Sequence, residues 1–126
     1  MEEHSERLRV AWVDTDAGGR IHFTAVFRWA ELAEMGLYRK LGLLEQGRAD
    51  YPRRRVEADY LRVLVFDDEV ELKIRVESVG RTSIRFTWEG IHAGDVAITG
   101  AHTIVHVDAN GRPAPIGEHE RALLTA

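Results

Sequence analysis

The sequence of 126 residues contains no cysteine. It can therefore form no disulfide bond, offers no thiol nucleophile and cannot bind zinc through cysteine thiolates. No apolar run approaches the roughly 20 residues that a membrane-spanning helix needs. Residues 1–6 are acidic, whereas a secretory leader begins with basic residues. We therefore expect a cytoplasmic protein that does not enter a membrane.

Charges of the two signs are nearly balanced, with 17 Lys and Arg against 21 Asp and Glu, and the formal net charge is −4. This charge argues against a general affinity for nucleic acid or anionic lipid. A polyanionic ligand would need a local basic cluster, and the sequence offers two, Arg53-Arg54-Arg55 and the turn that carries Arg81. The ordinary interpretation of the first is a solvated strand edge, whereas an arginine in a turn can reach a phosphate.

Length and composition predict one domain, residues 1–126, because 44% hydrophobic and 30% charged residues are typical of a globular chain and no linker divides it. Alternation over residues 7–13 predicts a half-buried strand. Its apolar face consists of Leu8, Val10 and Trp12. Thr24 then caps a predicted helix that runs to about Leu41 and stops at Gly42. The apolar stripe of this helix consists of Val26, Trp29, Ala30, Ala33, Leu37 and Leu41.

Four further strands are predicted in the second half of the chain, at residues 56–66, 69–79, 82–92 and 95–107. They have one apolar face and short turns, which is typical of an antiparallel meander. A strand, a long helix and four strands give an α+β fold, in which one five-stranded antiparallel sheet wraps around one long central helix. Such a sheet leaves its edges and one face of the helix exposed, so we expect a dimer.

The segment Asp14-Thr15-Asp16-Ala17-Gly18-Gly19 carries the strongest functional signal, because it places an acid where the chain reverses and a helix begins. A helix start presents unpaired N–H groups and the positive end of a dipole, which can polarise a carbonyl oxygen. The glycines allow a substrate carbonyl to approach the backbone closely. The pattern favours acyl transfer chemistry with Asp16 as the reactive acid. The ordinary alternative is that Asp16 only caps a turn.

This segment, followed by an aromatic helix containing Glu31, resembles the 4-hydroxybenzoyl-CoA thioesterase-like branch of the hotdog-fold acyl-CoA thioesterases. The likeness continues, in the expected order, through Tyr60-Leu61, Asp67-Asp68-Glu69, Gly80-Arg81-Thr82-Ser83-Ile84 and 107–113. The resemblance implies a hotdog fold, assembly as dimers or tetramers, and active sites at subunit interfaces. It implies hydrolysis of an acyl-CoA to the free acid and CoA, without a cofactor.

The resemblance also implies roles for particular residues. Asp16 corresponds to the catalytic carboxylate, and the backbone N–H of Phe23 to the group that holds the thioester carbonyl. Arg81 and Thr82 correspond to the turn that contacts the CoA phosphates. Many bacterial members have a histidine where this chain has Phe23, and His22 lies one position earlier. In the branch of the family that has a tyrosine at this position, the acid catalyses hydrolysis without the histidine. The absence of the histidine from this chain therefore does not exclude hydrolysis, but it leaves the substrate class open.

A thioester can be hydrolysed by few groups, because its leaving thiol has a pKa of roughly 8.5 and needs little help from a general acid. The acid could act as a nucleophile or as a general base. Two other functions remain open. One is an acyl carrier protein thioesterase, which would use Arg53 to Arg55 as an exposed docking patch. The other is a non-hydrolytic acyl-CoA binding module.

The remaining polar residues have ordinary interpretations. Asp14 is expected to accept backbone hydrogen bonds in the loop, and Glu31 to be solvated or paired across a dimer. His102 and His106 lie four apart on a strand, which is too far for both to bind one metal ion. We predict no metal site.

Overall fold

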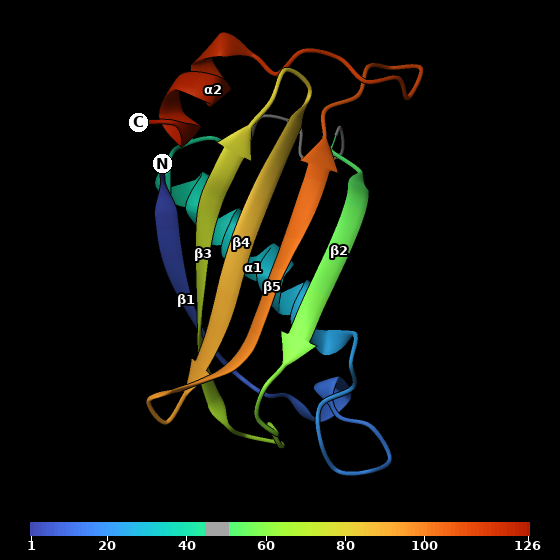
Figure 1. The fold of residues 1–126 in the computed structure, drawn as a ribbon, viewed down its shortest axis with the longest axis vertical. Coiled ribbons are helices and arrows are strands. Elements are labelled where there is room, and N and C mark those ends of the chain that lie inside the picture. Colours follow the sequence, from blue (N-terminus) through green and yellow to red (C-terminus); the bar gives the residue numbers. More distant parts are fainter. Residues whose placement is uncertain (45–50) are drawn as a thin grey trace.

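The computed structural model describes residues 1–44 and 51–126, which form one antiparallel sheet of order β1-β3-β4-β5-β2 with a long helix packed across one face (Figure 1). The strands are β1 (Glu3–Arg9), β2 (Arg53–Tyr60), β3 (Glu69–Val79), β4 (Ser83–His92) and β5 (Asp95–Val105). The helical elements are η1 (Trp12–Asp14, a 3-10 turn), α1 (Ala25–Lys40) and α2 (Glu118–Leu124). This arrangement confirms the predicted α+β fold.

The alternation of apolar and polar residues in β3 and β4 explains why one face of the sheet is buried. Alternate residues of the two strands are buried against α1, and pairs such as Ile74 with Trp88 and Val76 with Phe86 stand opposite each other. Two positive φ angles outside glycine, at Asp67 and Ala93, mark the predicted turns. The predicted strands 69–79, 82–92 and 95–107 therefore agree with the structure to within two residues at each end.

Helix α1 matches its predicted bounds. It runs from Ala25 to Lys40, and Gly42 follows it with a φ of +73°, a backbone conformation that glycine adopts without steric cost. Five residues of the predicted stripe are buried, and Leu41 packs partly against the same core. One detail of the helix start differs. Thr24 occupies the cap position but its side chain makes no capping hydrogen bond.

Two predicted strands have wrong ends. The first strand is Glu3–Arg9, and the chain then turns into η1, because the Asp14 carboxylate accepts the Ala11 N–H at 2.9 Å and the Asp14 N–H bonds to the Ala11 carbonyl. Trp12 is therefore 76% exposed and does not continue a buried face. The predicted strand 56–66 is the earlier segment Arg53–Tyr60. It ends where the N–H groups of residues 61 and 62 both turn to the Ala97 carbonyl.

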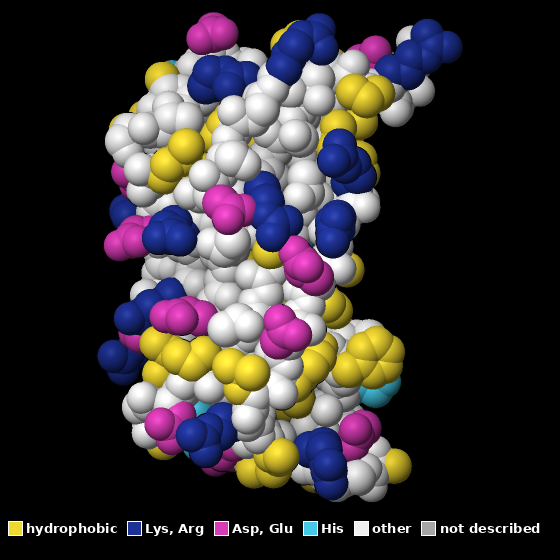
Figure 2. All heavy atoms as spheres, viewed as in Figure 1, with side chains coloured by type: hydrophobic (Ala, Val, Ile, Leu, Met, Phe, Trp, Pro, Cys, Tyr) yellow, Lys and Arg dark blue, Asp and Glu magenta, His cyan; other side chains and the backbone are white. Residues whose placement is uncertain are grey.

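These departures bring two exposed loops together near the end of β2. The rings of Trp12 and Phe66 pack edge to face at 5.6 Å, and the Tyr60 hydroxyl donates to the Phe23 carbonyl. Hydrophobic side chains gather across the lower part of the face in Figure 2, below a charged area. Ten large apolar side chains are exposed on these loops, β2 and α1: Trp12, Val13, Phe23, Leu32, Val56, Tyr60, Leu61, Val63, Val65 and Phe66. Exposed apolar surface of this extent is typical of an interaction surface.

Gly100 on β5 is expected to tolerate no side chain. An added Cβ would lie 2.6 Å from the Glu57 carbonyl oxygen and would press on the Trp88 ring. We expect Gly100→Ala to lower the free energy of unfolding by about 1–3 kcal/mol, the usual cost of overpacking. Urea denaturation measures this change. Gly117→Ala is the control, since nothing lies within 4 Å of its added Cβ. Equal stability of the two variants would contradict the expectation.

Candidate functional site

The loop between η1 and α1 holds Asp16 at an exposed tip. Its Oδ1 accepts the Gly18 N–H at 2.7 Å, while its backbone N–H donates to the Arg20 carbonyl at 2.8 Å. Gly19 takes a φ of +83° to close this turn. Within the described residues, Oδ2 of Asp16 makes no hydrogen bond. The carboxylate thus has the local role of a turn aspartate and presents one oxygen outward.

Asp14 anchors this loop to α1. Its buried carboxylate accepts hydrogen bonds from Arg28 at 2.7 Å, from the Trp29 indole at 3.3 Å and from the Ala11 N–H. Burial alone would raise the pKa of Asp14, but the hydrogen bonds from Ala11, Arg28 and Trp29, with the charge of Arg28, lower it below its ordinary value. Asp14 accepts a backbone hydrogen bond, as expected, and it also fixes the loop against the first turn of the helix.

We expect Asp14→Asn to lower the free energy of unfolding by about 1–3 kcal/mol, since it leaves buried donors poorly satisfied. The folded-state pKa of Asp14 lies below the unfolded value. Its stabilisation is therefore fully present above the ordinary value of 3.8 and is lost as pH falls through the folded pKa. Urea denaturation from neutral to acidic pH measures the free energy of unfolding of both proteins. The difference between the wild type and Asp14→Asn should become smaller below about pH 4. A difference that stays the same at every pH would contradict this account.

The start of α1 presents a donor beside this loop. Phe23 is 64% exposed, and within the described residues its backbone N–H donates to no acceptor. His22 accepts the backbone N–H of the cap residue, since its Nδ1 lies 3.2 Å from the Thr24 backbone nitrogen, and the same Nδ1 lies 2.7 Å from the Thr24 hydroxyl. The His22 ring also stacks on Phe23, with ring centroids 4.7 Å apart. An unpaired N–H at a helix start can hold a carbonyl oxygen or an oxyanion.

The turn that carries Arg81 and Thr82 lies at the other end of the sheet. β3 spans eleven residues, about 35 Å, between the Asp16 end and this turn (Figure 1). The Arg121 guanidinium donates to the Gly80 carbonyl at 2.8 Å, and the Ile116 N–H donates to the Arg81 carbonyl at 2.9 Å. The side chain of Arg81 is exposed. One chain therefore does not bring Arg81 and Thr82 to Asp16.

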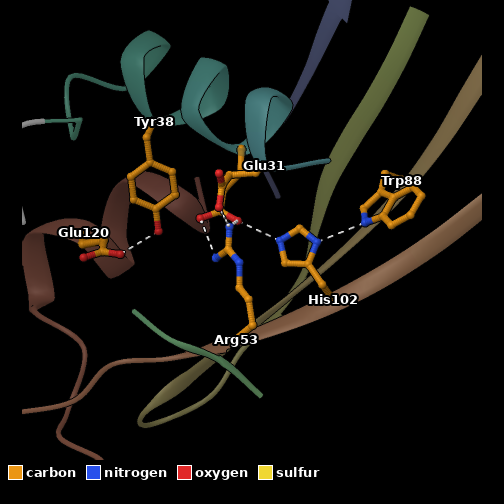
Figure 3. Close-up of polar contacts among 7 residues, drawn as sticks. Glu31, Tyr38, Arg53, Trp88, His102 and Glu120 are labelled. Carbon is orange, nitrogen blue, oxygen red and sulfur yellow. Dashed lines mark hydrogen bonds and ion pairs between the residues drawn. The ribbon is translucent and has the colours of Figure 1, made fainter. Parts of the chain in front are cut away.

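A buried polar network that the sequence did not predict crosses the space between α1 and the sheet (Figure 3). Glu34 of α1 is fully buried, and its carboxylate lies 2.7 Å from Nε2 of His102 and 2.9 Å from the Arg53 guanidinium. The Trp88 indole donates to Nδ1 of His102 at 3.0 Å. His102 therefore accepts at Nδ1 and donates from Nε2 to Glu34.

This network adds a role within the basic cluster. Arg53, Arg54 and Arg55 are all exposed on the edge strand β2, as the solvated-edge interpretation expects, but the Arg53 guanidinium also bridges Glu34 and Glu31. The sequence does hold a signal for Glu34, because it lies four residues after Ala30 and three before Leu37, on the buried side of the helix. His106 bonds to the Ala114 carbonyl, so the two strand histidines have different partners.

A cavity of about 200 Å³ lies between the first half of α1 and the strands β2 and β5, lined by Phe27, Arg28, Glu31, Arg53, Val56 and His102. A larger hollow of about 620 Å³ lies around β1, β3 and β4 and includes none of the predicted site residues. Over residues 1–44 and 51–126, no group of three or more His, Asp or Glu could hold a metal ion. In the same residues no helix is long and apolar enough to span a membrane.

Comparison with known proteins identifies the class. The thioesterase-like superfamily model matches residues 10–124, so the chain belongs to this superfamily. A thioesterase from Thermus thermophilus, complexed with coenzyme A and Zn, is 30% identical with a TM-score of 0.85, over 96% of this chain and 91% of that one. Comparison with curated sequences finds no match.

Two further solved structures share the fold. A 1,4-dihydroxy-2-naphthoyl-CoA thioesterase from Synechocystis has a TM-score of 0.90 at 14% identity, over 98% of this chain and 96% of that one. A DHNA-CoA thioesterase from Staphylococcus aureus has a TM-score of 0.85 at 20% identity, over 91% of this chain and 81% of that one. The predicted hotdog fold and acyl-CoA thioesterase family are confirmed, and the chain is a thioester hydrolase.

Proposed function

We propose that this protein hydrolyses an acyl-CoA to the free acid and CoA, with Asp16 as nucleophile or general base and the Phe23 N–H holding the thioester carbonyl. One observation carries the proposal. An unpaired backbone donor at the start of α1 stands beside a loop whose carboxylate has an oxygen without a partner in the described residues. A carboxylate and an oxyanion donor are the two groups that thioester hydrolysis requires.

The leaving group explains why so few groups suffice. A thiol with a pKa of roughly 8.5 leaves as the thiolate near neutral pH, so no general acid is needed. Asp16 would attack the acyl carbon directly, forming an acyl-enzyme anhydride that water cleaves, or would remove a proton from the attacking water. In both routes the carbonyl oxygen gains negative charge, which the Phe23 N–H stabilises. Losing one such donor typically costs about 10²–10³ in rate.

A second copy of the chain would complete the site. The ten exposed apolar side chains near β2, α1 and the loops offer a surface for it. Arg81 and Thr82 stand about 35 Å away along β3, so they would contact the CoA phosphates of a substrate bound at the other chain's Asp16. We propose a homodimer or homotetramer in the cytoplasm, with a small-molecule acyl-CoA as its substrate.

The decisive test measures release of free thiol from a panel of short, long and aromatic acyl-CoA substrates, alongside the same acyl groups on acyl carrier protein. Turnover of CoA thioesters supports the proposal. Turnover of carrier-bound thioesters alone would favour the carrier protein thioesterase. In that case neutralising the exposed Arg54 and Arg55 should remove activity. Saturable binding without turnover of any substrate would favour a non-hydrolytic binding module.

A further inference from the structure

The cavity beside α1 begins close to the predicted carbonyl-binding group. Phe27 lies four residues after Phe23 and Glu31 eight residues after it, so along the helix axis they stand about 6 Å and 12 Å from that position. A thioester held at the Phe23 N–H could therefore place its acyl group along the first two turns of α1.

The inner wall of the cavity is fixed by the buried network. The Phe27 ring packs edge to face on Trp88, with centroids 6.2 Å apart and planes at 83°. Trp88 is held in turn by its hydrogen bond to His102, which is bonded to the fully buried Glu34. A satisfied buried network of this kind is rigid, because moving one member leaves others unpaired in a medium of low dielectric. The ring of Phe27 is therefore supported on the side of the sheet by Trp88.

The far end of the cavity is charged. Arg53 and Glu31 meet there at 3.3 Å, and Arg53 continues to Glu34. A long alkyl chain passing this point would remove water from both charged groups without replacing their hydrogen bonds, which is costly. Size points the same way. An enclosed apolar cavity of about 150 Å³ holds benzene, so a half-open pocket of about 200 Å³ has room for a ring-sized or short branched group against its inner wall.

We propose that this cavity receives the acyl group, that Phe27, supported by Trp88, limits how far the group reaches inward toward the sheet, and that the Arg53–Glu31 pair limits it at the far end. The protein therefore selects compact acyl groups over long alkyl chains. Phe27 touches the acyl group directly, whereas Glu34 is a positioning residue that acts through Arg53 and through His102, which itself lines the cavity. The assignment of an acyl-CoA as the ligand rests on the proposed function.

The test uses S-butyl-CoA and S-dodecyl-CoA, thioethers that cannot be hydrolysed, in calorimetric titrations of the full chain. For the wild type we expect S-butyl-CoA to bind at least about tenfold more tightly than S-dodecyl-CoA, within the range by which apolar pockets discriminate. Phe27→Ala should reduce this preference to less than about threefold, because it opens the space in front of Trp88. Phe27→Leu, which keeps most of the apolar volume, should give an intermediate ratio.

The control is Leu123→Ala, which truncates a partly buried side chain on α2, away from the cavity, and should keep the wild-type ratio. Equal binding of the two thioethers by the wild type, no binding of either, or an unchanged ratio in Phe27→Ala would overturn the proposal. Because no bond is cleaved, the binding ratio stands even where no thioester is turned over. Conversely, turnover that depends on Asp16 but shows no length preference refutes only the cavity assignment.

Discussion

Replacing Asp16 with asparagine is expected to lower kcat for acyl-CoA hydrolysis by about 10²–10⁴-fold, the range that a positioned acid or base contributes. Asparagine keeps an oxygen that can accept the Gly18 N–H, so the turn should survive. It removes the negative charge that, in the proposed mechanism, attacks the acyl carbon or activates water. The change should appear mainly in kcat, because the Phe23 N–H and the cavity that are proposed to bind the substrate remain intact. Steady-state release of CoA, followed with a thiol reagent, measures it.

Two comparisons make this result interpretable. Thermal unfolding of Asp16→Asn should match the wild type within about 0.5 kcal/mol, as expected for an exposed position. Asp95→Asn removes another exposed carboxylate, at the start of β5, and should leave both kcat and stability unchanged. Wild-type turnover in Asp16→Asn would show that another group performs the chemistry. The turn-capping role would then be the whole role of this residue.

The parts of the fold predicted from sequence are those in which one strong periodicity dominates. Val70, Leu72, Ile74 and Val76 alternate without interruption, and the helix stripe runs from Val26 to Leu37. The predictions failed where a local hydrogen bond competes with periodicity. Trp12 continues the alternation of the first strand, but the Asp14 carboxylate captures the Ala11 N–H and bends the chain. Apolar residues at a strand end were thus assigned to the sheet although they are exposed.

The candidate site was predictable only in part, for a different reason. The Asp16 loop and the Phe23 N–H are local to one segment, so the motif indicates both. The partners of Glu34 are not local, since His102 lies 68 residues away and Arg53 lies 19 away. No periodicity encodes such a pairing. A charged residue on the buried side of a helix predicts that it has a partner of complementary charge or hydrogen bonding. Only the pairing of β5 with β2 in the structure shows which residues those partners are.

Removing the charge of Glu34 should have the largest effect on stability. Glu34→Gln leaves the Arg53 guanidinium without its buried counterion and disturbs the bond to His102. Loss of one partner from a fully buried ion pair typically costs about 3–5 kcal/mol, and we expect the lower end of this range because the Arg53 side chain is 30% exposed and keeps its contact with Glu31. Urea denaturation at neutral pH measures the change.

Glu31→Gln provides a closely matched control for this variant, since Glu31 lies on the same helix and contacts the same arginine. Its side chain is 61% exposed, so we expect a loss of at most about 1 kcal/mol. Burial is therefore the main difference between the two positions. The difference in the free energy of unfolding between Glu34→Gln and Glu31→Gln measures what burial of the carboxylate contributes. If Glu34→Gln costs no more than Glu31→Gln, the buried network does not stabilise the fold, and the inner wall of the cavity must be rigid for another reason.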